Sequence, residues 1–172
     1  MKIFSCLLVA VLGLAASSWA GSGNPKVGEM APAVDARDQD GHAWRLADFA
    51  GRKAVLLYFY PKDGTPGCTK EACGYRDQMG ELKSKGVEVV GVSMDNAESH
   101  KRFITAQRLN FNLLVDTDGK ITDSYGARMP AKNMARRISF LIGKDGRIAH
   151  VTDNPSAEKH LEETAVAIAA LK

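Results

Sequence analysis

The hydrophobic positions of this chain fall into two patterns that alternate along its length. Runs such as 54–60 and 87–93 are almost continuously apolar, which is typical of strands that are buried on both faces of a sheet. Between such runs, apolar residues recur at helical spacing, and two pairs of shorter runs flank turn signals that predict hairpins. The expected strands are 34–37, 42–45, 54–60, 87–93, 113–115, 138–142 and 147–151, and the expected helices are 68–85, 98–108 and 156–171.

The order of these elements predicts the fold class. A strand–helix–strand unit is followed by a hairpin and a closing helix, which is typical of a thioredoxin-like α/β fold with a central mixed sheet flanked by helices. The chain has 172 residues, enough for one domain with a substantial core. We expect this domain to cover residues 21–172.

The first 20 residues follow a different pattern. A positive start at Lys2 is followed by an uncharged apolar stretch, 3–16, and by small residues around Ala20. This pattern indicates a secretory signal peptide that is cleaved after Ala20. The apolar stretch is shorter than the roughly 20 residues that a membrane-spanning helix needs. We therefore expect a periplasmic protein that has no membrane attachment once residues 1–20 are removed.

Charge and residue spacing argue against several classes of binding protein. Without the leader the chain keeps 22 basic and 20 acidic side chains, a balance that argues against nucleic acid or membrane binding. The Asp-x-Asp-Gly strings at 38–41 and 116–119 lack the full calcium-loop pattern and predict ordinary turns. Four histidines without metal-ligand spacing are expected at the surface. They are His42, His100, His150 and His160.

The segment 61–73 carries the candidate chemistry. It follows the buried strand 54–60 and leads into a helix for which Thr65 is a good N-cap and Pro66 a good first residue. Cys68 is then the third helical residue. A thiol at this position faces free backbone N–H groups and the positive end of the helix dipole, which favour the thiolate. Because only the thiolate is a useful nucleophile, the segment predicts a reactive sulfur.

A second cysteine, Cys73, follows five residues later. On an ideal helix this offset separates the two Cα atoms by roughly 8.6 Å, whereas a disulfide needs them within about 7 Å. The sulfurs can therefore join only when the first turns of the helix unwind. This suits a pair in which one sulfur attacks and the other resolves. The spacing alone leaves a structural disulfide, or two unrelated thiols, as alternatives.

The same segment resembles a known family. Pro61, Thr65 and Cys68 form the pattern P-x-x-x-T-x-x-C, which resembles the active-site signature of the peroxiredoxins. The fuller string 59–71 is similar to the bacterioferritin comigratory protein, or peroxiredoxin Q, subgroup. A resolving cysteine at the position of Cys73 is one form that this subgroup uses. The resemblance covers nearly all of the chain after the leader, which cytoplasmic members lack.

The resemblance also implies an arginine beside the sulfur. Peroxiredoxins hold an arginine three residues before an aromatic residue in a late strand, and Arg137 has this spacing to Phe140, so it is preferred to Arg136. A guanidinium near the sulfur stabilises the thiolate and can donate hydrogen bonds to the peroxide oxygens as charge develops. Glu71 is expected to help hold Arg137 in place.

The implied reaction needs no metal or organic cofactor. Cys68 attacks hydrogen peroxide or an alkyl hydroperoxide and becomes a sulfenic acid, Cys73 joins it in a disulfide, and a thioredoxin-like dithiol protein restores both thiols. Thr65 is expected to hold its hydroxyl toward the sulfur or the peroxide, or only to cap the helix. Pro61 is expected to exclude water and to pre-set the loop. The expected protein is a monomer.

Two other functions compete with this one. A periplasmic thiol–disulfide oxidoreductase has the same fold, but it normally uses C-x-x-C, whereas four residues separate the cysteines here. It would also leave Thr65 and Arg137 without a role. A non-catalytic binding module stabilised by a disulfide leaves the same polar residues unexplained.

Overall fold

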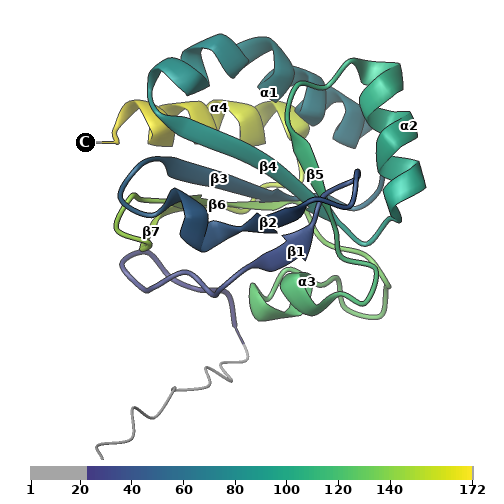
Figure 1. Cartoon of the computed structure of the whole chain (residues 1–172), viewed down its shortest axis with the longest axis horizontal. Coiled ribbons are helices and arrows are strands. Elements are labelled where there is room, and N and C mark those ends of the chain that lie inside the picture. The colour runs from purple at the N-terminus through teal and green to yellow at the C-terminus, as the bar shows by residue number, and fades with distance from the viewer. Residues whose placement is uncertain (1–22, 172) are drawn as a thin grey trace, which may run out of the picture.

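The computed structural model describes residues 23–171, so the expected leader and its cleavage position lie outside the described residues. Its centre is a mixed five-stranded sheet with the strand order β5-β4-β3-β6-β7 (Figure 1). The strands are β3 (Ala54–Phe59), β4 (Val87–Ser93), β5 (Asn112–Val115), β6 (Ile138–Ile142) and β7 (Ile148–Thr152).

The central strand β3 explains how the sheet is built. It pairs in parallel with β4 on one side and antiparallel with β6 on the other, and all six of its residues are buried. Because side chains alternate along a strand, Leu56 and Tyr58 enter one core cluster while Leu57 and Phe59 enter the other. A continuous apolar run in the sequence therefore corresponds to a strand with a core on each face.

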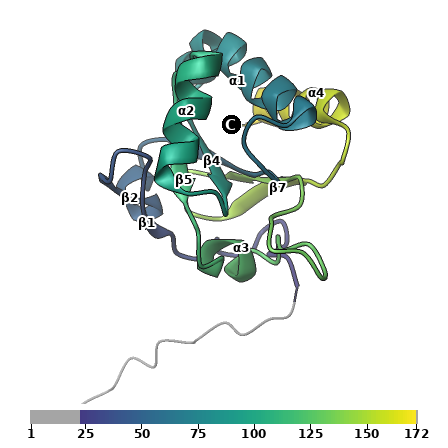
Figure 2. The ribbon, with the colours of Figure 1, turned by 90° about the vertical axis from the view of Figure 1, so that its right-hand side faces the viewer.

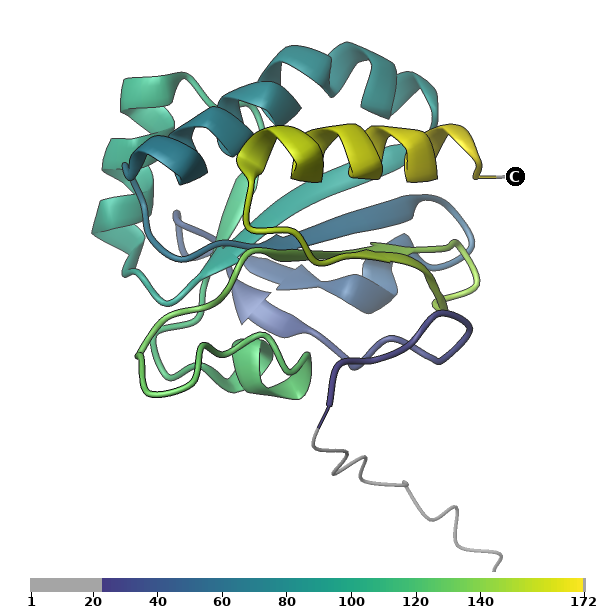
Figure 3. The ribbon, with the colours of Figure 1, turned by 180° about the vertical axis from the view of Figure 1, so that it is seen from behind.

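Three helices cover one face of the sheet: α1 (Pro66–Ser84), α2 (Ala97–Gln107) and α4 (Ala157–Ala169). Figure 3 shows α4 running beside α1 across this face. The two helices approach closely at Gly74, where a Cβ atom would lie only 2.4 Å from Leu161 Cδ1. This contact fixes the C-terminal helix against the helix that carries both cysteines.

The other face is covered by smaller elements. They are the antiparallel hairpin of β1 (Asp35–Arg37) and β2 (Ala43–Arg45), the 3₁₀-helix η1 (Leu46–Phe49) and the short helix α3 (Lys120–Ser124). In Figure 2, α3 lies on the side of the sheet away from α1 and α4.

The two Asp-x-Asp-Gly strings are turns, as predicted. In the β1–β2 hairpin, Asp38 Oδ1 accepts the N–H groups of Asp40 and His42, each at 2.9 Å. The acidic and imidazole groups of these three residues lie within 4.8 Å of one another, and Asp38 uses its carboxylate to close the turn. In the second string, the Asp116 carboxylate accepts the N–H of Thr122 at 2.7 Å and so caps α3.

The predicted fold class is confirmed, and every expected strand and helix is present with ends that differ by at most a few residues. Two elements were not predicted, η1 and α3. They have four and five residues, which is too short for hydrophobic periodicity to reveal them. Within residues 23–171, none of the helices combines the length and hydrophobicity that crossing a membrane requires.

Candidate active site

The site begins where β3 ends and the chain turns into α1. The helix starts at Pro66 with Thr65 as its N-cap residue, as the sequence predicts. The carbonyl of Thr65 accepts the N–H of Thr69 at 2.8 Å, but its side chain makes no capping bond. The hydroxyl donates instead to the carbonyl of Lys62 at 3.1 Å. In this structure the Thr65 side chain therefore stabilises the loop rather than the helix end.

The loop is anchored to α2 through Asp63. Its carboxylate accepts the hydroxyl of Tyr60 at 2.7 Å and lies 2.9 Å from Nδ1 of His100. The other ring nitrogen of His100 lies 3.2 Å from the carbonyl of Leu114. Both ring nitrogens of His100 therefore lie within hydrogen-bond distance of an oxygen atom. Burial opposes ionisation of Asp63, but the hydrogen bond and charge of His100 outweigh it, so the pKa of Asp63 is lowered.

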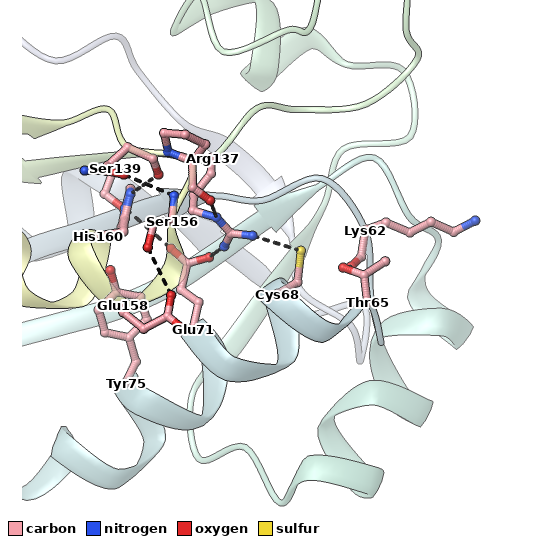
Figure 4. A network of polar contacts seen from close by, with 12 residues as sticks. Lys62, Thr65, Cys68, Glu71, Tyr75, Arg137, Ser139, Ser156, Glu158 and His160 are labelled. Atoms are coloured by element: carbon pink, nitrogen blue, oxygen red, sulfur yellow. Dashed lines mark hydrogen bonds and ion pairs between the residues drawn. The ribbon is translucent and has the colours of Figure 1, made fainter.

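Cys68 lies in the first turn of α1 and is only 2% exposed. Its Sγ atom is 3.7 Å from Nη2 of Arg137, which reaches it from the residue before β6 (Figure 4). Two further contacts fix the guanidinium: Nε donates to the carbonyl of Pro155 at 3.1 Å, and Nη1 donates to Glu71. The structure thus places a buried thiol against a cation whose orientation is fixed.

Arg136, which precedes Arg137 in the sequence, makes a different ion pair. Arg136 pairs with Asp153, and its side chain is 25% exposed, against 8% for Arg137.

Gly67 leaves room for the guanidinium of Arg137, because a Cβ atom there would lie 3.0 Å from Nη2 of Arg137. Sequence reasoning missed this role of Gly67, although a glycine inside the first turn of a helix is a usable signal of close approach.

Cys73 has different surroundings on the same helix. It is half-buried, and its Sγ atom lies 3.7 Å from Oε1 of Gln107 at the end of α2. Both cysteines lie on one continuous helix, as the sequence predicts, and both are free thiols in this structure. Pro61 is half-buried in the loop before α1. Its shielding role and the pairing of the two sulfurs stay predictions.

Behind Arg137 lies Glu71, one turn after Cys68 on α1. Its side chain is fully buried, and burial raises the pKa of its carboxyl to about 8, an effect that the charge of Arg137 offsets only in part. One carboxyl oxygen, Oε2, accepts from Arg137. The other, Oε1, has no hydrogen-bond partner.

The unpartnered oxygen faces His160 of α4, whose ring is also fully buried. Nε2 of His160 lies 3.4 Å from Glu71 Oε1 and 2.7 Å from the hydroxyl of Ser139, and Nδ1 lies 3.1 Å from the carbonyl of Asn154. Burial lowers the pKa of His160 to about 4. The prediction that the histidines lie at the surface is therefore wrong for His100 and His160.

The placement of Arg137 beside Cys68 suits a nucleophilic thiolate. A buried sulfur at a helix N-terminus, with a fixed guanidinium beside it, can be held as a thiolate and can attack a small electrophile. The same guanidinium can donate hydrogen bonds to an oxygen that becomes negative during the reaction. The fold brings Arg137 from a distant segment to Cys68 and Glu71 of α1, whereas Pro61 and Thr65 lie in the loop just before this helix.

Comparisons with known proteins agree with this chemistry. The profile of the AhpC/TSA family matches residues 27–151. The chain is 46% identical over 144 residues to peroxiredoxin Bcp of Escherichia coli (strain K12), covering 80% of this chain and 92% of that protein. It is similar to the crystal structure of peroxidoxin BcpB from Mycobacterium tuberculosis, with a TM-score of 0.80, 29% identity, and coverage of 87% of this chain and 99% of the other.

A second solved structure is that of the bacterioferritin comigratory protein of Xanthomonas campestris, described for its alkyl peroxide reduction activity. The TM-score is 0.73 at 26% identity, covering 80% of this chain and 90% of that one.

Proposed function

Since this chain belongs to the AhpC/TSA family, as a peroxiredoxin of the Bcp/peroxiredoxin Q subgroup, we propose that its thiol peroxidase activity proceeds through a Cys68 sulfenic acid and a Cys68–Cys73 disulfide. The observation that carries this proposal is the buried Cys68 sulfur, 3.7 Å from the fixed guanidinium of Arg137.

In the first step the Cys68 thiolate attacks one oxygen of hydrogen peroxide or an alkyl hydroperoxide. A sulfur–oxygen bond forms, the O–O bond breaks, and the sulfur loses two electrons. The leaving oxygen takes up the proton that the thiol released and departs as water or an alcohol. Arg137 stabilises the thiolate beforehand and donates to the oxygen that gains negative charge.

In the second step Cys73 attacks the sulfenic acid, and water leaves as the disulfide forms. Because both residues lie on α1, the first turns of the helix must unwind before the two sulfurs can meet. A thioredoxin-like dithiol protein then reduces the disulfide by exchange and is itself oxidised.

The leader pattern of residues 1–20 also bears on the compartment in which the protein acts. We propose a monomeric protein that acts in the periplasm after cleavage near Gly21, and hence an exported dithiol protein as its reductant. Mass spectrometry of the periplasmic fraction tests this: a mature N-terminus near Gly21 supports it, whereas an intact Met1 form in the cytoplasm contradicts it.

One assay separates the peroxidase from the alternative oxidoreductase. The reduced protein is given hydrogen peroxide or an alkyl hydroperoxide, and the same sample is tested for insulin reduction. We expect rapid peroxide consumption and little insulin reduction. Cys68→Ser should abolish peroxide consumption, whereas Cys73→Ser should consume about one equivalent and then stall. Insulin reduction without peroxide consumption would contradict the proposed mechanism.

A further inference from the structure

Gln107, the last residue of α2, contacts the sulfur of Cys73 and is tied to the helix that carries it. Its side-chain oxygen Oε1 lies 3.7 Å from Cys73 Sγ and accepts the S–H of that thiol. Its backbone carbonyl accepts Nη1 of Arg76 at 2.6 Å, and Arg76 follows Cys73 by about one turn of α1. The acceptor oxygen of Gln107 is therefore held in place beside the sulfur.

The two cysteines point to different sides of α1. Residues five positions apart are rotated by about 140° around a helix axis. Accordingly, Cys68 faces Arg137 on one side of the helix, whereas Cys73 faces Gln107 on another. A disulfide between the two sulfurs can form only when this arrangement is broken.

The contact with Gln107 exists only while Cys73 carries its hydrogen. In the resolving step the Cys73 sulfur bonds to the Cys68 sulfur, and the S–O bond of the sulfenic acid breaks. The hydroxyl leaves as water with the proton that Cys73 gives up. Neither the attacking thiolate nor the disulfide has an S–H to donate. The contact thus stabilises the reactant but not the transition state, and it slows the step that breaks it.

Arg76 acts on the same sulfur in the opposite sense. A hydrogen bond with Asp77 is the main cause that raises the pKa of Arg76, and the nearby charge of Cys73 adds to the rise. A cation close to a sulfur favours its thiolate. Gln107 therefore opposes the attack that Arg76 favours.

We propose that Gln107 is a positioning residue of the resolving step: it retains Cys73 as a thiol against α2, and so sets how long the Cys68 sulfenic acid lasts and how easily peroxide overoxidises it. This inference rests on the proposed Cys68–Cys73 disulfide. A second peroxide molecule competes with Cys73 for the sulfenic acid. It adds one oxygen to the Cys68 sulfur, which becomes a sulfinic acid, and departs as water or an alcohol.

Single-turnover kinetics of the reduced protein measure this retention. One equivalent of hydrogen peroxide is added, the reaction is stopped with acid at intervals, and peptide mass spectrometry follows the Cys68 sulfenic acid and the disulfide. Gln107→Leu has no acceptor and should form the disulfide about threefold faster, as expected for the loss of one modest hydrogen bond. Gln107→Glu keeps an acceptor oxygen and adds a charge that opposes the thiolate, so it should form the disulfide more slowly than the unchanged protein.

Gln78→Leu is the matched control, at a half-buried position of the same helix α1, and should leave the rate of disulfide formation unchanged. Excess peroxide gives a second readout. The peroxide concentration that converts half of Cys68 to sulfinic acid should rise about threefold in Gln107→Leu, because the two reactions compete for one sulfenic acid. A merely structural role of Gln107 would alter stability without moving this concentration.

The failure of this inference differs from the failure of the proposed function. If Gln107→Leu formed the disulfide no faster than the unchanged protein, or if Gln78→Leu accelerated it equally, the inference would be overturned and the proposed function would stand. If Cys73→Ser gave no sulfenic acid on Cys68, the proposed function itself would be rejected.

Discussion

The two cysteines of α1 lie five residues apart, yet their environments differ in kind. Cys68 is almost fully buried and faces a guanidinium that Glu71 and a carbonyl hold in place. Cys73 is half-buried beside α2, where the nearby guanidinium of Arg76 donates to the carbonyl of Gln107 at 2.6 Å. One helix thus presents one sulfur to a fixed cation and another to a more open boundary between helices. The difference fits an attacking sulfur and a resolving sulfur.

The largest expected effect comes from removing the cation at Cys68. Arg137→Ala should lower the second-order rate with peroxide by about 10²–10³, the usual cost of losing one preorganised donor. Arg137→Lys should recover only part of the rate, because an ammonium keeps the charge but not the planar fork. Stopped-flow oxidation of each reduced variant provides the measurement.

Arg136→Ala is the matched control for this prediction. Its guanidinium pairs with Asp153 and makes no contact with Cys68. If Arg136→Ala slowed the reaction and Arg137→Ala reacted at the normal rate, Arg137 would not be the residue that distinguishes Cys68 from Cys73.

A smaller effect is expected from releasing the loop before Cys68. Asp63→Ala leaves the Tyr60 hydroxyl and one nitrogen of His100 without their buried partner, and should lower the free energy of unfolding by about 2 kcal/mol. Lys62→Ala, at the exposed neighbouring position, should have little effect because it keeps the carbonyl that accepts from Thr65. Urea unfolding of the reduced proteins measures both. Equal stability of the two variants would show that the Asp63 contacts do not anchor the loop.

The smallest expected effect is a pH dependence of stability that arises at Glu71. Its pKa is raised from 4.5 to about 8 on folding, so its contribution to stability is complete below about pH 4.5 and is lost as the pH rises toward 8. We expect the free energy of unfolding to fall by about 1 kcal/mol between pH 5.5 and 6.5, relative to a variant with Glu71→Gln. Both proteins should carry Cys68→Ser, so that the thiol does not titrate. A constant difference across this range would mean that Glu71 is ionised in the folded protein.

Sequence reasoning reached the elements and the sulfur, and the family resemblance added Arg137 and Glu71, but neither identified the two buried histidines. The continuous apolar runs predict β3 and β4, and the Thr65–Pro66 start predicts where α1 begins, because these signals are local. His100 and His160 give no such signal. Each is an isolated histidine in a helical segment, and only the folded chain brings it to Asp63 or Glu71 from a distant segment.

The central claim is that Cys68 reacts first and Cys73 then joins it on the same chain. The most direct test is to treat the reduced protein with one equivalent of hydrogen peroxide, block the remaining thiols with an alkylating reagent and map the peptides by mass spectrometry. We predict a Cys68–Cys73 disulfide within one chain, and, in Cys73→Ser, a sulfenic acid trapped on Cys68. A sulfenic acid trapped on Cys73 in Cys68→Ser, with Cys68 left unoxidised in Cys73→Ser, would contradict the account.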